Sequence, residues 1–224
     1  MQDLAIETNC VTRRYNGFPA LNRVSIQITP GSRIALLGDN GSGKTTLLSI
    51  LSTLLQSSEG SATILGYDIA KKSTALRNVI GVIRHQPMLY ENFSPIEDLD
   101  LFAKIYGVSD AGEQIRRLLT SVGMWRLRNE AIGTFSRGQK QRLMIAKALL
   151  HKPKVLLLDE PEIGLDQNGL KVLDELILMR EEESTPITVL AATHREERMD
   201  TWATGFVRLE RGQIIETTLS ENAR

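Results

Sequence analysis

The sequence predicts an α/β protein with a mostly parallel sheet, and three observations lead to this prediction. Short apolar runs typical of buried strands, such as residues 155–158, alternate with segments of helical periodicity. A glycine-rich loop joins the apolar run 34–37 directly to a helix. From about residue 94 to residue 151 the periodicity is helical throughout. We therefore expect a sheet covered by helices on both faces, with a helical subdomain inserted into an α/β core.

Composition limits the class of protein and its partners. The 224 residues suffice for one large domain, or for one domain with an inserted subdomain, and a hydrophobic content of 42% is typical of globular proteins. Lys+Arg and Asp+Glu each total 27, so we expect no nucleic-acid partner. The single cysteine, Cys10, excludes an internal disulfide. We see no secretory signal and no apolar run near the ~18 residues of a membrane helix, so any membrane part should come from another chain.

The elements can be placed in order along the chain. Two short strand-like stretches are expected within residues 4–30, around a turn at Asn16-Gly17. Pro87 and Pro153 mark the two ends of the inserted helical part. The other expected elements are strand 34–37, helix 45–55, a loop at 57–60, strands 62–65, 80–83 and 155–158, helix 168–182, strand 187–191, a short helix around 196–201 and a hairpin over 206–215.

Residues 38–45 follow the pattern G-x-x-x-x-G-K-[ST] of a phosphate-binding loop. Its glycines allow a tight bend in which successive N–H groups converge on phosphate oxygens. Lys44 would reach the β- and γ-phosphates, and the Thr45 hydroxyl would hold Mg²⁺. An ordinary glycine-rich turn is the alternative, but a strand before the loop and a helix after it favour nucleotide binding. The residues assigned to the nucleotide are Gly38, Asp39, Asn40, Gly41, Ser42, Gly43, Lys44, Thr45 and Thr46.

A second group of polar residues ends the apolar run 155–158. Asp159 and Glu160 follow this run directly, and we expect the strand to lie beside the phosphate-loop strand. Asp159 would then bind the metal, directly or through water, and Glu160 would polarise the attacking water as a general base. Two acids at a strand end are common in any protein, but together with a phosphate-binding loop they indicate nucleotide hydrolysis.

Residues 135–139 (Phe-Ser-Arg-Gly-Gln) are similar to the Leu-Ser-Gly-Gly-Gln signature of the ATP-binding subunits of ABC transporters. Nearly the whole chain resembles that family. Without the resemblance, Ser136 would simply be a helix N-cap. The resemblance implies that Ser136, Arg137, Gly138 and Gln139 present a helix N-terminus to the nucleotide.

The resemblance also implies a fold and a domain organisation. The fold would be that of the ABC ATPases, which are P-loop NTPases with a RecA-like, mostly parallel core, an antiparallel β-subdomain and an inserted α-helical subdomain. Residues 1–224 would form a single ABC ATP-binding domain. Its core would be about 1–86 and 153–224, and its helical subdomain about 87–152.

Four further residues match functional positions of the family. Tyr15 matches the aromatic residue that stacks on adenine, and Gln86 matches the glutamine that senses Mg²⁺ and couples to the membrane partner. Asp166 matches the aspartate of a loop at the dimer interface, and His194 matches the histidine that contacts the γ-phosphate. With ATP and Mg²⁺ as the implied cofactors, the catalytic set is Glu160, His194, Gln86 and Lys44, and the metal set is Thr45, Gln86 and Asp159.

The resemblance implies partners and a location as well. Two copies would enclose two ATP molecules head to tail, so that Lys44, Thr45 and Glu160 of one copy face Ser136 and Gly138 of the other. Separate transmembrane subunits would hold the dimer at the cytoplasmic face of a bacterial plasma membrane.

Two residues depart from the family pattern. Arg137 replaces the first signature glycine, which adds bulk and charge near the interface. Glu162 stands where the family more often has an uncharged residue. Neither departure removes a catalytic group, so we expect an active ATPase.

The transported substrate is less directly encoded than the ATPase. Residues 85–94 and 135–138, in a short chain without an added regulatory domain, resemble the ATP-binding subunit of the haem exporter of bacterial cytochrome c maturation. General ABC-2 exporters of drugs, lipids or polysaccharides are the alternative, and a soluble ABC ATPase is a more distant one. We expect no direct haem binding, because His85 and Cys10 are better explained as loop and core residues. The groove around residues 86–94 is the expected contact with the membrane subunit.

Nucleotide-binding proteins of other classes fit the chain less well. A small GTPase would need an Asn-Lys-x-Asp motif for its base, and none occurs. A small-molecule kinase would share the phosphate-binding loop, but it would lack residues 135–139 and an acidic pair followed by a histidine such as His194.

Overall fold

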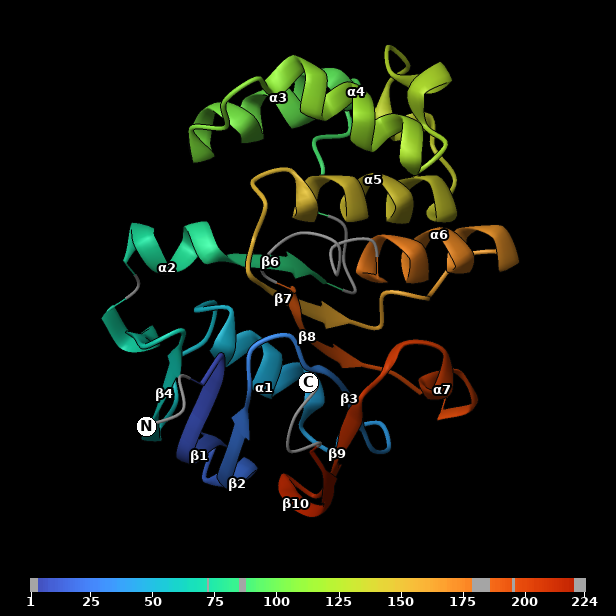
Figure 1. The fold of residues 1–224 in the computed structure, drawn as a ribbon. Coiled ribbons are helices and arrows are strands. Elements are labelled where there is room, and N and C mark those ends of the chain that lie inside the picture. The colour runs from blue at the N-terminus through green and yellow to red at the C-terminus, as the bar shows by residue number, and fades with distance from the viewer. Residues whose placement is uncertain (1–3, 72, 85–87, 179–185, 195, 220–224) are drawn as a thin grey trace.

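The computed structural model describes residues 4–71, 73–84, 88–178, 186–194 and 196–219. Two sheets and a set of helices form one body (Figure 1). Helices α3, α4 and α5 lie at one end, and the sheet that contains β1 and β2 lies at the other (Figure 1). Among the described residues, no helix is long and apolar enough to cross a bilayer.

The larger sheet has six strands in the order β10-β9-β3-β8-β7-β6. All neighbouring pairs are parallel except β9 and β10, which form an antiparallel hairpin. This arrangement confirms the predicted mostly parallel sheet. The strands are β3 (Arg33–Leu37), β6 (Ile80–Ile83), β7 (Val155–Asp159), β8 (Thr188–Ala192), β9 (Gly205–Glu210) and β10 (Gln213–Thr218).

One predicted neighbour relation in this sheet is wrong. Strand β7 was expected beside β3, but β8 lies between them and pairs with both. Successive strands of a parallel sheet are joined by crossovers, so spatial order need not follow chain order. At the carboxyl edge of the sheet, Ala192 of β8 therefore pairs with Leu36 of β3 on one side and with Asp159 of β7 on the other.

Both faces of the six-stranded sheet are buried, as its apolar runs predict. In β7, Leu156 and Leu158 pack against α3, α4, α5 and the other helices on one side. Val155 and Leu157 point to the opposite side, where they meet α1 and the second sheet. This alternation follows from the two-residue period of a strand, and it produces two separate cores around one sheet.

The second sheet is antiparallel, with the order β2-β1-β4-β5. Its first strands are longer than the short stretches expected from the sequence. Register shifts between Thr8 and Val11 and again before Arg14 interrupt the two-residue alternation, so the pattern shows only fragments of each strand. Strand β4 also starts at Glu59, inside the segment expected to be a loop. The strands are β1 (Ile6–Tyr15), β2 (Phe18–Ile28), β4 (Glu59–Ile64) and β5 (Tyr67–Asp68).

The helices partly match their predicted ranges. Helix α1 (Lys44–Leu51) ends four residues earlier than expected, and Thr53, just beyond it, adopts a left-handed backbone conformation. Helix α2 (Thr74–Val79) was not foreseen. Helix α6 (Gln167–Leu178) starts near its expected place, and the rest of its predicted range, 179–182, lies outside the described residues. The others are α3 (Pro95–Tyr106), α4 (Ala111–Ser121), α5 (Arg137–Leu149) and α7 (Met199–Trp202), with 3-10 turns η1 (Ile69–Lys71), η2 (Trp125–Leu127), η3 (Ile132–Thr134) and η5 (Glu196–Arg198).

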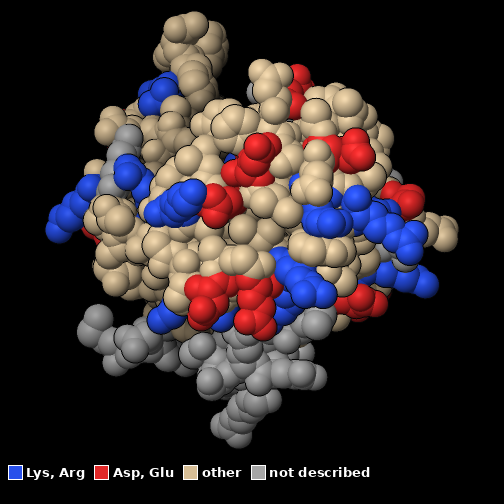
Figure 2. All heavy atoms as spheres, turned by 90° about the horizontal axis from the view of Figure 1, so that it is seen from above, with Lys and Arg blue, Asp and Glu red and all other residues tan. Residues whose placement is uncertain are grey.

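Charged side chains of both signs are interspersed on the face seen in Figure 2. Lysines and arginines alternate there with aspartates and glutamates in small groups, as the balanced composition of the chain leads one to expect.

Candidate functional site

Residues 38–43 form the loop between β3 and α1. Gly38 has a backbone φ of 134°, and a Cβ atom there would lie 2.1 Å from the carbonyl oxygen of Leu209. Only glycine fits so close an approach. The Gly212 N–H donates to the carbonyl oxygen of Ser42 at 2.9 Å, and this bond attaches the loop to the β9–β10 turn. The loop is therefore held in a fixed, tightly curved shape.

Lys44 crosses this loop from the first turn of α1. Its side chain is buried, and Nζ donates to the carbonyl oxygens of Gly38 at 2.6 Å and Asp39 at 3.0 Å. Burial lowers the pKa of Lys44 below its ordinary value, while the carboxylates of Glu160, Asp159 and Asp39 act in the opposite direction. A desolvated cation of this kind has a high affinity for an anion placed beside it.

Two further features fit a phosphate group at this loop. Helix α1 has no side-chain cap, so its first N–H groups are available to an anion. The Ser42 hydroxyl is buried and has no hydrogen-bond partner among the described residues. A polyphosphate at this loop would accept hydrogen bonds from the uncapped N–H groups, the Ser42 hydroxyl and the Lys44 ammonium, which are all donors.

Thr45 and Asp159 meet at the carboxyl edge of the sheet. The Thr45 hydroxyl donates to Oδ1 of Asp159 at 3.1 Å, even though β8 lies between β7 and β3, the strand that leads into α1. Helix α1 makes the contact possible, because it packs across the sheet onto β7. A hydroxyl and a carboxylate held together are oxygen ligands of the kind that Mg²⁺ prefers, so the pair fits the predicted metal site.

Glu160 and His194 face each other across the ends of β7 and β8. The Glu160 N–H donates to the carbonyl oxygen of Ala192 at 3.0 Å, and Nε2 of His194 hydrogen-bonds Oε1 of Glu160. Glu160 has a φ of +52°, which is uncommon for a residue with a side chain. Strained backbone is found most often at functional sites, where the surroundings hold it in place. The pair has the geometry of a general base oriented by a histidine.

The signature residues lie at the start of α5. The Ser136 hydroxyl accepts from the Gln139 N–H at 3.3 Å, and the Ser136 N–H donates to Oε1 of Gln139 at 2.9 Å. Ser136 is therefore an N-cap in this structure, and Gln139 completes a capping box. Gly138 lies so close to the loop after β7 that a Cβ atom there would stand 2.7 Å from the carbonyl oxygen of Gly164.

A second contact joins the loop after β7 to α5. Asp166 caps the start of α6 by accepting from the Gly169 N–H at 2.7 Å, and it pairs with Arg142 of α5 at 2.7 Å. The Gly169 hydrogen bond, followed by the smaller effect of Arg142, lowers the pKa of Asp166. Buried Gln141 donates from Nε2 to the carbonyl oxygen of Pro161 at 2.7 Å. Gln141 and Arg142 were not singled out from the sequence, since polar residues of a helix are usually solvated.

The two departures from the family pattern have different environments. Arg137 is exposed, and its aliphatic stem lies against Gly164. Glu162 is buried, and Oε1 accepts a hydrogen bond from the hydroxyl of Thr193. Thr193 was missed by the sequence analysis, although a polar residue directly after the apolar strand β8 could have drawn notice.

Of the remaining predicted residues, Tyr15 and Ser136 contact residues outside the cluster of Lys44, Thr45, Asp159, Glu160 and His194 (the Lys44 cluster). Tyr15 ends β1, is 46% exposed, and packs against the Arg13 guanidinium at 4.8 Å. Within the described part of the chain, neither Tyr15 nor Ser136 bonds to Lys44. Gln86 lies outside the described residues. The predicted site residues therefore include one group around Lys44 and another at the start of α5.

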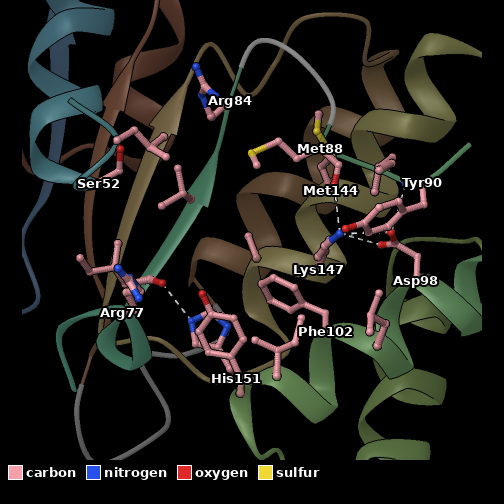
Figure 3. A pocket seen from close by; sticks show the side chains of 18 of the residues that line it. Ser52, Arg77, Arg84, Met88, Tyr90, Asp98, Phe102, Met144, Lys147 and His151 are labelled. Atoms are coloured by element: carbon pink, nitrogen blue, oxygen red, sulfur yellow. Dashed lines mark hydrogen bonds and ion pairs between the residues drawn. The ribbon is translucent and has the colours of Figure 1, made fainter. Parts of the chain in front are cut away.

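A separate groove of about 560 Å³ is lined by residues of β6, α3 and α5 and by the segment that follows α1 (Figure 3). At its edge, Lys147 of α5 pairs with Asp98 of α3 at 2.9 Å and donates to the carbonyl oxygen of Met88 at 3.0 Å. The Asp98 side chain is fully buried, and the Lys147 side chain is 13% exposed. The lining residues include Ser52, Leu54, Arg77, Ile80, Arg84, Met88, Leu89, Tyr90, Leu101, Phe102, Ile105, Tyr106, Met144 and His151.

Comparison with known proteins gives a consistent result. A family model described as "ABC transporter" matches residues 21–162. The bacitracin transport ATP-binding protein of Bacillus licheniformis is 33% identical over 211 residues, which is 94% of this chain and 68% of that protein. The doxorubicin resistance ATP-binding protein of Mycobacterium tuberculosis is 33% identical over 217 residues, 95% of this chain and 65% of that protein.

Solved structures agree with these sequence relatives. A structure described as the ATP-binding subunit of an ABC transporter has a TM-score of 0.88 and 28% identity, and the match covers 96% of this chain and 90% of that one. An ATP-binding cassette solved as a dimer in a post-hydrolysis state, with ADP and Pi, has a TM-score of 0.85 and 26% identity, over 97% of this chain and 99% of that one. The predicted fold class is confirmed.

Proposed function

This chain belongs to the ABC transporter family as an ATP-binding, ATP-hydrolysing subunit, and we propose that it drives an exporter of antibiotics or other drugs. The observation that carries the ATPase assignment is the meeting of Lys44, Thr45, Asp159, Glu160 and His194 at one edge of the parallel sheet. The names of the relatives support the class of cargo.

The proposed roles follow from the contacts of each residue. Lys44, Ser42 and the N–H groups of α1 bind the phosphates of ATP. Thr45 and Asp159 hold Mg²⁺, which neutralises charge on the phosphates when it is bound. Glu160 accepts the proton of the attacking water, and His194 orients Glu160 and contacts the γ-phosphate. The predicted contributions of Tyr15, to the adenine, and of Gln86 remain proposals.

We propose that the working unit is a head-to-tail homodimer. Among the described residues, Ser136 and Gly138 at the start of α5 form no hydrogen bond with the Lys44 cluster of the same copy, so a second copy would have to bring its signature to that cluster. The solved cassette that crystallised as a dimer after hydrolysis supports this arrangement. Residues of about 87–152 would act as a helical subdomain attached to a core of about 1–86 and 153–224.

The class of cargo is proposed from the relatives rather than from the site. Two proteins of 33% identity are named for bacitracin transport and doxorubicin resistance. They favour the general exporter over the haem exporter suggested by residues 85–94, of which 85–87 lie outside the described residues.

The groove beside Lys147 is the proposed contact with the membrane subunit. Large apolar side chains around it are exposed, with Leu54 at 51%, Met88 at 61% and Ile105 at 69%. Arg77 and Arg84 also line it, and neither forms an ion pair within the described part of the chain (Figure 3). A short amphipathic segment with an acidic residue, at the cytoplasmic face of the membrane, would satisfy both the apolar surface and the charge.

The groove proposal can be tested with two charge reversals. Arg84→Glu should weaken stimulation of ATP hydrolysis by the membrane subunit. Glu91, which pairs with Lys140 at 2.7 Å beside the groove, lies in the stretch first predicted to make this contact. If Arg84→Glu and Glu91→Lys both leave stimulation and transport intact, the membrane subunit docks elsewhere.

The cargo proposal is tested by deleting this chain from the source organism. We expect several-fold greater sensitivity to at least one antibiotic of a panel, restored by the wild-type chain and not by Lys44→Ala. A haem stain of c-type cytochromes in the same strains provides the contrasting result. Loss of covalent haem with unchanged antibiotic sensitivity would support the haem exporter and contradict the drug exporter.

A further inference from the structure

We propose that Glu162 and Thr193 form a positioning pair that sets the relative placement of Glu160 and His194. The proposal rests on the hydrolytic roles assigned above to Glu160 and His194. Neither Glu162 nor Thr193 is expected to touch ATP. They would act by holding the two segments that carry the reacting groups.

The pair joins the two segments close to the reacting side chains. Glu162 lies two residues after Glu160, and Thr193 directly precedes His194. Both are buried, at 6% and 5% exposure, and the Thr193 hydroxyl donates to Oε1 of Glu162. A bond so near to both groups restricts their relative movement more than a distant contact would.

Other bonds fix each member of the pair to the body of the protein. The Thr193 N–H donates to the carbonyl oxygen of Leu36, the next-to-last residue of β3, at 3.3 Å. On the other side, Gln141 of α5 holds the carbonyl oxygen of Pro161, and the Leu165 N–H donates to the carbonyl oxygen of Glu162 at 3.2 Å. The pair is therefore anchored both to the phosphate-loop strand and to the signature helix.

The backbone of Glu160 explains why such a pair is needed. With φ at +52°, Glu160 adopts a conformation that a free chain rarely visits, so neighbouring contacts must maintain it. On the N-terminal side of this strained residue, the Glu160 N–H donates a hydrogen bond to the carbonyl oxygen of Ala192 and so fixes the backbone there. The Glu162–Thr193 bond acts just after it and completes the constraint.

A different role for Glu162, as a third carboxylate at the metal, agrees less well with the contacts. The carboxylates that act on Lys44 are those of Glu160, Asp159 and Asp39. Glu162 instead turns its Oε1 toward Thr193, the residue directly after β8. A carboxylate is a strong acceptor for a hydroxyl, so the hydrogen bond from Thr193 explains why an acidic residue stands at position 162.

The test compares ATP affinity with the rate of ATP hydrolysis in single and double variants. Thr193→Val removes the hydroxyl with little change in shape, and Thr193→Ser keeps it. Glu162→Ala removes the acceptor, and Glu162→Gln keeps an oxygen in place. Thr188→Val is a matched control, because Thr188 is a buried threonine at the start of β8, the strand that leads to Thr193, and its hydroxyl accepts from Gly31 N–H at 2.9 Å.

We expect Thr193→Val and Glu162→Ala each to lower kcat by roughly 10-fold or more, while the Kd for ATP stays within about twofold of the wild type. Thr193→Ser and Glu162→Gln should retain most of the activity. The double variant should be no slower than the worse single variant, because both changes break one bond. Thr188→Val should lower the melting temperature and leave kcat unchanged.

Three results would overturn the proposal. These are a wild-type kcat in Thr193→Val, full additivity of the two changes, and an equal fall of kcat in Thr188→Val, which would mean general damage to the strand. A Glu160→Gln variant that hydrolyses ATP at the normal rate would instead contradict the proposed role of Glu160. The two failures can therefore be told apart.

Discussion

Replacing Lys147 by methionine should destabilise the protein far more than removing an exposed ion pair. The Asp98 carboxylate has no exposed surface, and Lys147 contacts it at 2.9 Å. Lys147→Met keeps the apolar stem but leaves a buried charge unpaired, which costs about 3–5 kcal/mol. For a chain of this size, a loss of that order lowers the melting temperature by roughly 6–20 °C.

Thermal unfolding followed by calorimetry measures this effect, and two further variants control it. Arg208 pairs with Glu196 at 2.8 Å, but the Glu196 side chain is 54% exposed, so Arg208→Met should cost about 1 kcal/mol or less. Adding Asp98→Asn to Lys147→Met should recover most of the loss, because no unpaired charge then remains. If Lys147→Met melts no lower than Arg208→Met, the reasoning from burial is refuted.

Three further predictions follow from the site. Burial lowers the pKa of Lys44 below 10.5, and bound phosphates should raise it again. ATP binding at a pH just below 10.5 should therefore take up protons. Lys44→Arg should abolish this uptake in calorimetry with buffers of different ionisation enthalpy. Between the lowered pKa of Lys44 and 10.5, the unfolded chain binds more protons than the folded chain. The free energy of unfolding therefore rises with pH across that window. Gly138→Ala places a carbon 2.7 Å from the Gly164 carbonyl oxygen and should reduce ATP hydrolysis by roughly 10- to 100-fold with ATP binding at Lys44 retained, as turnover and equilibrium binding would show. Glu160→Gln should accumulate an ATP-bound dimer, and gel filtration with ATP that shows only monomer would contradict the head-to-tail arrangement.

The loop and its helix could be predicted because their chemistry is local in the sequence. Gly38 and Lys44 lie within one short motif, and the apolar run before it identifies a strand. The acidic end of β7 was also foreseen, and Asp159 does reach Thr45. The order of strands was not foreseen, because an apolar run does not reveal which other strand will lie beside it. The insertion of β8 is what brings His194 against Glu160.

Side-chain partnerships between distant segments were the hardest features to foresee. Thr193 and Glu162 are 31 residues apart, and Lys147 and Asp98 are 49 residues apart. Polar residues are usually solvated, so neither member of a pair predicts the other. Asp98 did give a signal, because it shares a helix face with Leu101 and Phe102, and a charge on an apolar face needs a buried partner.

The long strands of the antiparallel sheet illustrate a different limit. The alternation of polar and apolar residues in β1 is broken where the register shifts near Cys10, which has a φ of +49°. A bulge moves the following residues to the opposite faces, so a two-residue period cannot be followed across it.

The most direct test of the composite, two-copy ATPase mixes two inactive variants. Lys44→Ala disables the phosphate-binding loop, and Gly138→Asp disables the signature. If each site takes its loop from one copy and its signature from the other, a mixed dimer keeps one intact site. An equal mixture should then regain up to about a quarter of the wild-type ATPase rate, because about half of randomly assorted dimers are mixed. ATP hydrolysis that stays at the level of the separate variants, when cross-linking shows that mixed dimers form, would contradict the account.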